Sequence, residues 1–122
     1  MRNLEERSSK ILIHGKICVK HGNERLFLPK KNIIMFVKNG RKTDMHTTEG
    51  IFSIPASLNH VEKKLDNRHF FRSHQSFIIN LMMIKKIVAT DLETYVVMEH
   101  TNARAQITKQ NEKRLYELIE VF

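Results

Sequence analysis

Tryptophan is absent from this 122-residue chain, and cysteine, proline and glycine are scarce, with one, two and four residues. Because Cys18 is the single cysteine, no disulfide can form within the chain, and a reducing, cytoplasmic location is expected. No apolar run approaches the length that spans a bilayer, and no signal-peptide stretch follows the polar start MRNLEERSSK. These absences disfavour a disulfide-stapled secreted protein and a membrane-spanning one, and we expect no membrane partner.

Acidic residues are also in the minority, with 13 Asp and Glu against 21 Lys and Arg, so the net charge is +8. Such an imbalance informs about partners and not about fold. Phosphate polymers are the first partner to expect, ahead of anionic membrane surfaces and acidic proteins. Hydrophobic residues make up 41% of the chain, which is enough for the core of one domain.

Catalytic and metal-binding motifs are missing, although the chain has seven histidines. No HExxH or CxxC spacing is present, and neither a nucleophile elbow nor a glycine-rich phosphate loop occurs. We therefore expect no enzymatic activity, no metal, no cofactor and no small-molecule substrate.

Hydrophobic residues alternate with polar ones over most of the chain, which predicts β-strands. Residues 1–10 are expected to form a flexible leader, and residues 11–122 one domain with about eight to ten short antiparallel strands. The expected strands are 11–20 with a kink at Gly15, 25–29, 33–37, 42–47, 51–54, a segment that starts at FFRSH and continues through FII, 84–89, 94–99 and 103–107. The first 55 residues are expected to form one meander, with hairpin turns at HGNE (21–24) and Asn39-Gly40.

Two segments have helical spacing. Ser57 is a potential N-cap for a short helix with Leu58, Val61 and Leu65 on one face. Thr108 is a potential N-cap for a second helix, whose apolar stripe is expected to comprise Leu115, Leu118, Ile119 and Phe122. The chain is therefore expected to be mainly β with two peripheral helices, and not a helix-turn-helix.

The stretch HFFRSHQSFIINLMMIKKI (69–87) places a cation, an imidazole and an amide between two apolar segments. On a strand, Arg72 and His74 share one face, with Ser73 and Gln75 on the other. Arginine suits phosphate or guanine, glutamine can pair with adenine, and histidine can donate or accept. From the residues alone, the alternative interpretation is that His74 is a core histidine bonded to the backbone and that Arg72 is a surface salt-bridge residue. Asn80 is interpreted as a turn former or helix cap.

Two further cationic sites flank this stretch in the sequence. KNGRKTD (38–44) predicts a basic hairpin tip from which Lys38, Arg41 and Lys42 project. Lys109 lies where the last strand meets the last helix, and the start of a helix attracts phosphate. Solvated surface charge is the alternative interpretation of both sites.

The run FFRSHQSFIINLMMIKKI, preceded by LNHVEKKL and followed by YVVM and AQITKQNEKRLYEL, resembles the LytTR-type DNA-binding domain of bacterial transcription regulators. The resemblance covers roughly residues 10–118. It implies an elongated β fold that presents loops and strand ends to successive major grooves of double-stranded DNA. It also implies binding to paired repeats, often with bending of the DNA, and a homodimer on DNA.

Carried onto this sequence, the resemblance gives seven candidate DNA-binding residues: Arg41, Lys42, Thr43, Arg72, His74, Gln75 and Lys109. We expect base reading from His74, Gln75 and Thr43. We expect backbone or mixed contacts from the four cations. The family usually has Ser-Arg where Thr108-Lys109 stands here, and lysine keeps the charge but loses the bidentate fork.

Two other functions stay open at this point: an RNA-binding or single-strand-binding β module, and a basic adaptor for an acidic protein. Family members usually carry a receiver or sensory domain ahead of this one, whereas only about ten residues precede the first expected strand. The sequence leaves open whether the chain is a stand-alone regulator or a fragment of a response regulator. The target site, the input signal and the direction of regulation are not set by these patterns.

Overall fold

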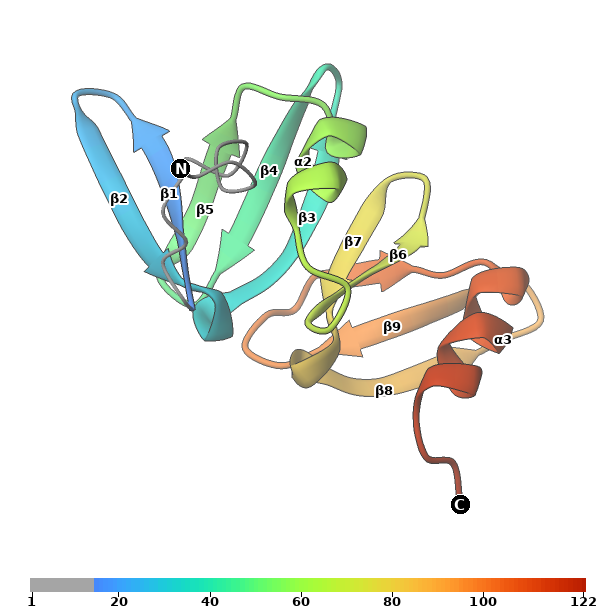
Figure 1. Ribbon diagram of the computed structural model, residues 1–122. Helices are drawn as coiled ribbons and strands as arrows, with labels where there is room; N and C mark the ends of the chain where they lie inside the picture. The colour runs from blue at the N-terminus through green and yellow to red at the C-terminus, as the bar shows by residue number, and fades with distance from the viewer. Residues whose placement is uncertain (1–14) are drawn as a thin grey trace, which may run out of the picture.

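The computed structural model describes residues 15–122, which form ten strands and two α-helices (Figure 1). The strands are β1 (Lys16–His21), β2 (Glu24–Pro29), β3 (Ile33–Asn39), β4 (Lys42–Thr47), β5 (Gly50–Ile54), β6 (Phe70–His74), β7 (Phe77–Asn80), β8 (Ile84–Ala89), β9 (Thr94–Met98) and β10 (Arg104–Gln106). The helices are α2 (Leu58–Lys64) and α3 (Lys109–Leu118), with the 3₁₀ turns η1 (Lys30–Asn32) and η2 (Leu81–Met83). The expected mainly β fold is confirmed. The expected leader and the start of the first strand lie outside the described residues.

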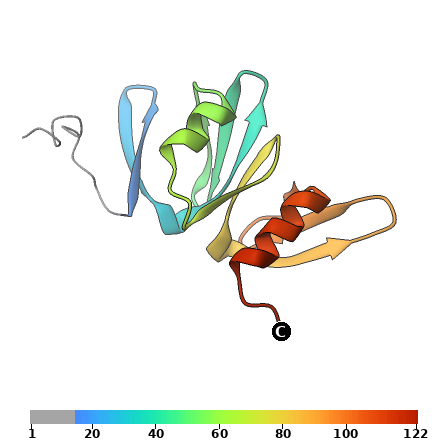
Figure 2. The ribbon, with the colours of Figure 1, turned by 45° about the vertical axis from the view of Figure 1, so that its right-hand side comes forward.

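The strands are divided among three antiparallel sheets. A central sheet has the order β5-β4-β3-β7-β6, while β1-β2 and β10-β9-β8 form separate smaller sheets. The three sheets follow one another along an elongated molecule (Figures 1 and 2). The single meander expected over the first 55 residues is therefore wrong in one respect, because β1 and β2 pair only with each other.

Strand β3 is apolar on both faces because the central sheet is covered on both faces at this strand. On one face, Phe36 and Ile78 pack with α2 and the β1-β2 hairpin. On the other face, Met35 and Ile79 pack with the β8-β9-β10 sheet and with Leu115 of α3. This burial on both faces explains why the run IIMFV (33–37) contains no polar residue.

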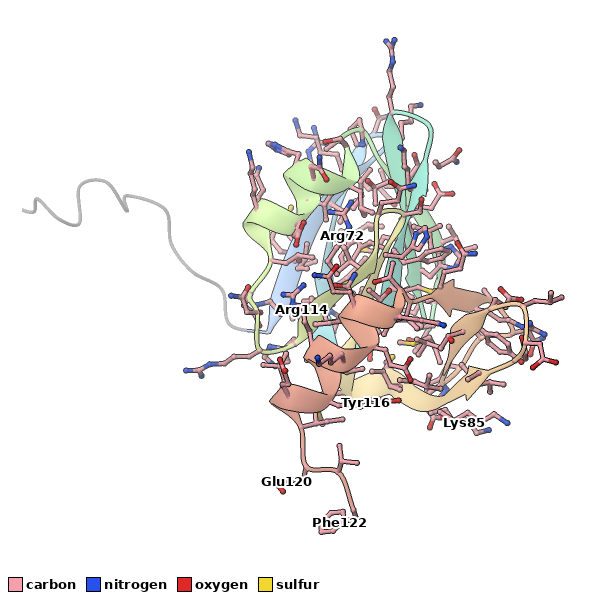
Figure 3. The ribbon with its side chains drawn as sticks, turned by 90° about the vertical axis from the view of Figure 1, so that its right-hand side faces the viewer. Arg72, Lys85, Arg114, Tyr116, Glu120 and Phe122 are labelled. Carbon is pink, nitrogen blue, oxygen red and sulfur yellow. The ribbon has the colours of Figure 1, made fainter. Side chains whose placement is uncertain are left out.

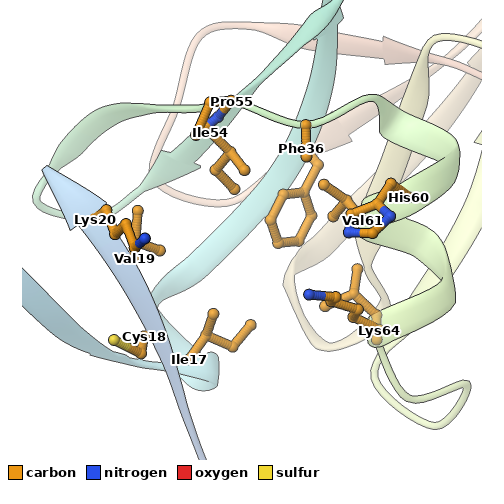
Figure 4. Close-up of a pocket in the computed structure, with 12 residues that line it drawn as sticks. Ile17, Cys18, Val19, Lys20, Phe36, Ile54, Pro55, His60, Val61 and Lys64 are labelled. Carbon is orange, nitrogen blue, oxygen red and sulfur yellow. The ribbon is translucent and has the colours of Figure 1, made fainter.

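An apolar groove of about 260 Å³ remains between β1 and α2 (Figure 4). Its walls include Ile17, Val19, Phe36, Ile54 and Val61. Lys20, His60 and Lys64 also line the groove.

Both predicted helix caps are present. Ser57 Oγ accepts from the His60 N–H at 3.2 Å, and Thr108 Oγ1 accepts from the Asn111 N–H at 3.0 Å. The apolar stripe expected along the last helix is wrong beyond Leu115, because α3 ends at Leu118 and that side chain is 64% exposed. Neither helix in residues 15–122 is long and apolar enough to cross a membrane.

Residues 70–80, which were expected to form one continuous strand, form the β6-β7 hairpin. Phe70 pairs with Asn80 and His74 pairs with Phe77, so the chain reverses at Gln75-Ser76. The turn between β3 and β4 is likewise shifted by one residue from the expected Asn39-Gly40. Asn39 pairs with Lys42, and Gly40, at φ 63°, and Arg41 form the loop. Both shifts place polar side chains at hairpin tips.

Asn80 is an architectural residue, as the sequence indicated. It is 1% exposed. Its Nδ2 donates to Ile33 O at 2.8 Å, and its Oδ1 accepts from the Met82 N–H at 2.9 Å. The side chain thus ties β3 to the start of η2.

Asp66, just after α2, collects four hydrogen bonds. Lys30 Nζ lies 2.8 Å from one carboxylate oxygen, and His69 Nδ1 lies 2.7 Å from the other. The N–H groups of Arg68 and His69 also donate to this carboxylate. Burial by itself would raise the pKa of Asp66, but the hydrogen bonds from Lys30 and His69 hold this pKa well below its usual value.

We expect Asp66→Asn to lower the free energy of unfolding by about 1 kcal/mol at neutral pH, because the carboxylate is partly solvated. The native pKa lies below the unfolded value of about 3.9, so the carboxylate stabilises the fold above that value. The stabilisation is lost as the pH falls below it. Urea denaturation between pH 7 and pH 2 should therefore show the gap between wild type and variant narrowing as the pH falls below about 4. A constant gap would contradict the assignment, and Asp91→Asn, at an exposed turn, is the control.

Candidate nucleic-acid interface

Four segments that are distant in the sequence follow one side of the molecule. They are the β3-β4 turn, the start of α2, the β6-β7 turn and the start of α3 (Figures 1 and 2). Lys38, Asn59 and Gln75 line one hollow of about 200 Å³ on this side. His74 and Lys109 line another, of about 340 Å³. We call these four segments the reading edge.

The β3-β4 turn presents the densest positive charge of the reading edge. Lys38, Arg41 and Lys42 are all exposed around Gly40. Asn39 Nδ2 donates to the Asp44 carboxylate at 3.0 Å and braces the hairpin across its two strands. The turn therefore presents three cations on a short hairpin braced by this hydrogen bond.

Thr43 lies inside the molecule, although the sequence made it a candidate base reader. It is 0% exposed, and its Oγ1 donates to Ala56 O at 2.9 Å. Side chains alternate along β4, so exposing Lys42 directs Thr43 into the core. The hydroxyl attaches β4 to the segment ahead of α2 and is not available to a base.

Arg72 is held within the molecule by four hydrogen bonds. Nε donates to His74 O at 2.9 Å, and Nη2 donates to Gln75 O at 2.6 Å. Nη1 donates to Glu62 Oε1 at 2.6 Å and to Asn59 Oδ1 at 3.1 Å. The side chain is 20% exposed and lies between α2 and the hairpin (Figure 3). Of the two roles open to Arg72, this geometry favours the structural one over a DNA contact.

The β6-β7 turn presents Gln75 and His74 differently. Gln75 is exposed, whereas His74 is partly buried with its ring edge-on to Phe77 at a centroid distance of 5.9 Å. The Ser76 N–H donates to His74 Nδ1 at 3.1 Å. Ser76 O accepts from the Lys38 N–H at 2.9 Å, which fastens this turn to the basic hairpin.

Ser73 joins the β6-β7 hairpin to the start of α3. It is buried, and its Oγ donates to Gln106 O at 2.8 Å. Its carbonyl accepts from the Thr108 N–H at 3.1 Å and from Asn111 Nδ2 at 3.0 Å. The start of α3, which carries exposed Lys109, is therefore attached to the β6-β7 hairpin.

Several of these supporting residues were not singled out by the sequence. Asn59, Glu62, Ser73 and Asn111 are ordinary polar residues in their local patterns. The one available signal was that Ser73 shares a strand face with buried Phe71, which would place a hydroxyl in the core. Within residues 15–122, no three His, Cys, Asp or Glu side chains gather to hold a metal ion.

Comparison with known proteins identifies the family. The sequence matches the family model of the LytTr DNA-binding domain over residues 23–120. This chain belongs to the LytTr DNA-binding domain family. The expected family and its fold are thereby confirmed, and the chain falls in a class of DNA-binding domains from transcription regulators.

Curated relatives of this LytTr domain are transcription regulators. Transcriptional regulatory protein NatR of Bacillus subtilis strain 168 is 35% identical over 106 residues, covering 86% of this chain and 46% of the relative. Transcriptional regulatory protein LytR of Staphylococcus aureus strain N315 is 32% identical over 80 residues, covering 66% of this chain and 32% of the relative. The chain thus spans less than half the length of either regulator.

A solved structure supports the fold. The LytTr DNA-binding domain of a putative methyl-accepting/DNA response regulator from Bacillus cereus superimposes with a TM-score of 0.72. The match covers 85% of this chain and 95% of that domain at 22% identity. At this identity the likeness establishes the shared architecture.

Proposed function

We propose that this LytTr domain binds double-stranded DNA sequence-specifically through its reading edge, as the DNA-binding part of a bacterial transcription regulator. One observation carries the proposal: exposed cations and the exposed amide of Gln75, from segments distant in the sequence, lie on the same side of the fold. Turns and strand ends, not an inserted helix, would face successive major grooves. The domain would act in the cytoplasm on paired repeats, as a homodimer on the DNA, without a catalytic step.

The residues divide into two roles. Lys38, Arg41 and Lys42 contact phosphates, because their charges are exposed on a turn that can follow the backbone. Gln75 reads a base edge, and its amide can pair with adenine through both of its groups. Lys109 contacts a phosphate or makes a single bond to guanine.

Two substitutions test this division. Lys109→Ala should weaken binding to every duplex by about three- to tenfold at moderate salt and reduce the salt slope by about one. Gln75→Ala should instead relax preference at one base position while leaving the salt slope unchanged. Selection of duplexes from a random pool, followed by titration of selected and scrambled sites, measures both effects. Equal binding by wild type and both variants would contradict the division.

Competition separates this function from its alternatives. A single-strand binder presents exposed aromatic rings on a sheet face, but Phe36, Phe70 and Phe71 are buried here. Phe27 is 51% exposed, but it lies on β2, in the separate β1-β2 sheet. We expect selected duplex to compete far better than single-stranded DNA or RNA of the same sequence. A gel shift that detects no duplex binding by nucleic-acid-free protein would favour the adaptor for an acidic protein.

A further inference from the structure

We propose that the β6-β7 turn is a preformed reading element, locked by Arg72, that offers a hydrogen-bond donor from His74 Nε2 to a base acceptor. This inference rests on the proposed DNA-binding function and specifies its chemistry. It assigns Arg72 as a positioning residue and His74 as a specificity-determining residue.

The lock consists of contacts to main-chain carbonyls. The Arg72 guanidinium donates both to His74 O and to Gln75 O, so one rigid fork fixes two consecutive peptide groups of the turn. Its remaining nitrogen, Nη1, donates to Glu62 and Asn59 of α2. Lysine at position 72 could not replace this fork, because an ammonium group is a single point charge on a flexible stem. The conformation of the turn is therefore set before any ligand arrives.

The tautomer of His74 follows from a hydrogen bond within the β6-β7 turn. The Ser76 main-chain N–H can only donate, so His74 Nδ1, at 3.1 Å, must accept and carries no proton. In the neutral ring the proton then resides on Nε2. His74 lines the hollow that also contains Lys109 of the reading edge and Asp91 and Glu93 of the β8-β9 turn. Nε2–H is therefore the group of this ring that can meet a base.

A single donor selects among base edges. In the major groove, purine N7, guanine O6 and thymine O4 are acceptors, whereas adenine N6 and cytosine N4 are donors. The His74 Nε2–H therefore favours a purine N7, a guanine O6 or a thymine O4. Exposed Gln75 beside it can donate and accept at the neighbouring base.

Base analogues test the donor directly. In the selected duplex, each purine is replaced in turn by its 7-deaza analogue, guanine by 2-aminopurine and thymine by 5-methyl-2-pyrimidinone, which remove N7, O6 and O4. We expect one analogue to weaken wild-type binding about tenfold and to leave His74→Asn binding unchanged, since that variant retains an amide acceptor near Nδ1 but lacks Nε2–H. An analogue profile that is the same for wild type and variant would overturn the assignment.

Arg72→Lys tests the lock. The ratio of affinities for selected and scrambled duplex should fall about tenfold, while the salt slope stays constant because the charge is kept. Glu62→Gln, which weakens the anchor, should lower the same ratio. Arg25→Lys makes the same exchange at an exposed position outside the reading edge and should leave the ratio intact, and thermal melts check the fold of each variant. Should Arg72→Lys keep the ratio, the lock is wrong. Should wild type itself fail to distinguish the duplexes, the proposed function fails instead.

Discussion

Removing the exposed cations of the reading edge is expected to lower affinity for the selected duplex on the order of 10³-fold at 0.1 M salt. The variant replaces four residues with glutamine: Lys38, Arg41, Lys42 and Lys109. Each cation that neutralises a phosphate releases counterions, and each release contributes about 0.9 to the slope of log affinity against log salt. Losing four such contacts should flatten this slope by about 3 to 4, which over the decade from 0.1 M to 1 M salt gives the stated loss.

A matched variant separates these contacts from bulk charge. Arg25, Lys31, Lys85 and Lys86 are exposed cations outside the reading edge. Figure 3 shows Lys85 well away from Arg72. Changing these four residues to glutamine alters the net charge equally but should reduce affinity only slightly. Fluorescence anisotropy across a salt series measures both variants. Equal losses would mean that binding follows net charge, and the reading edge would lose its support.

The substitution Asn80→Ala is expected to lower the free energy of unfolding by about 2–4 kcal/mol. Alanine would leave Ile33 O without its donor and the Met82 N–H without its acceptor in a position that is 1% exposed. A buried polar group without a partner costs about 1–3 kcal/mol, and the substitution leaves two such groups, Ile33 O and the Met82 N–H. Since small domains are stable by only about 5–15 kcal/mol, this is a large fraction of the total.

Urea denaturation followed by circular dichroism measures this loss, and Asn102→Ala is the control. Asn102 is exposed in the β9-β10 connection, so the control should change stability by less than about 0.5 kcal/mol. Folded Asn80→Ala should still prefer the selected duplex, because the residue supports the hairpin from inside. An Asn80→Ala protein of normal stability that no longer prefers that duplex would make Asn80 a DNA contact and contradict its architectural role.

Local chemistry by itself determined much of this protein. Period-two patterns located the strands. Ser57, Thr108 and Asn80 were predictable as caps because their short polar side chains bond to the neighbouring main chain. The excess of cations indicated a phosphate polymer as partner without reference to the fold. The motif around FFRSHQSFIIN identified the family, which the match over residues 23–120 confirmed.

Only the tertiary structure decided what each candidate side chain touches. Thr43 and Lys42 are neighbours, and it is the covering of one sheet face that buries the first and exposes the second. Arg72 is bound by Glu62, ten residues earlier, and by carbonyls of a turn where the sequence predicted a continuing strand. The physical reason is that alternation and capping are properties of a few adjacent residues. Burial, ion pairing and the orientation of a donor depend on segments that meet only when the chain has folded.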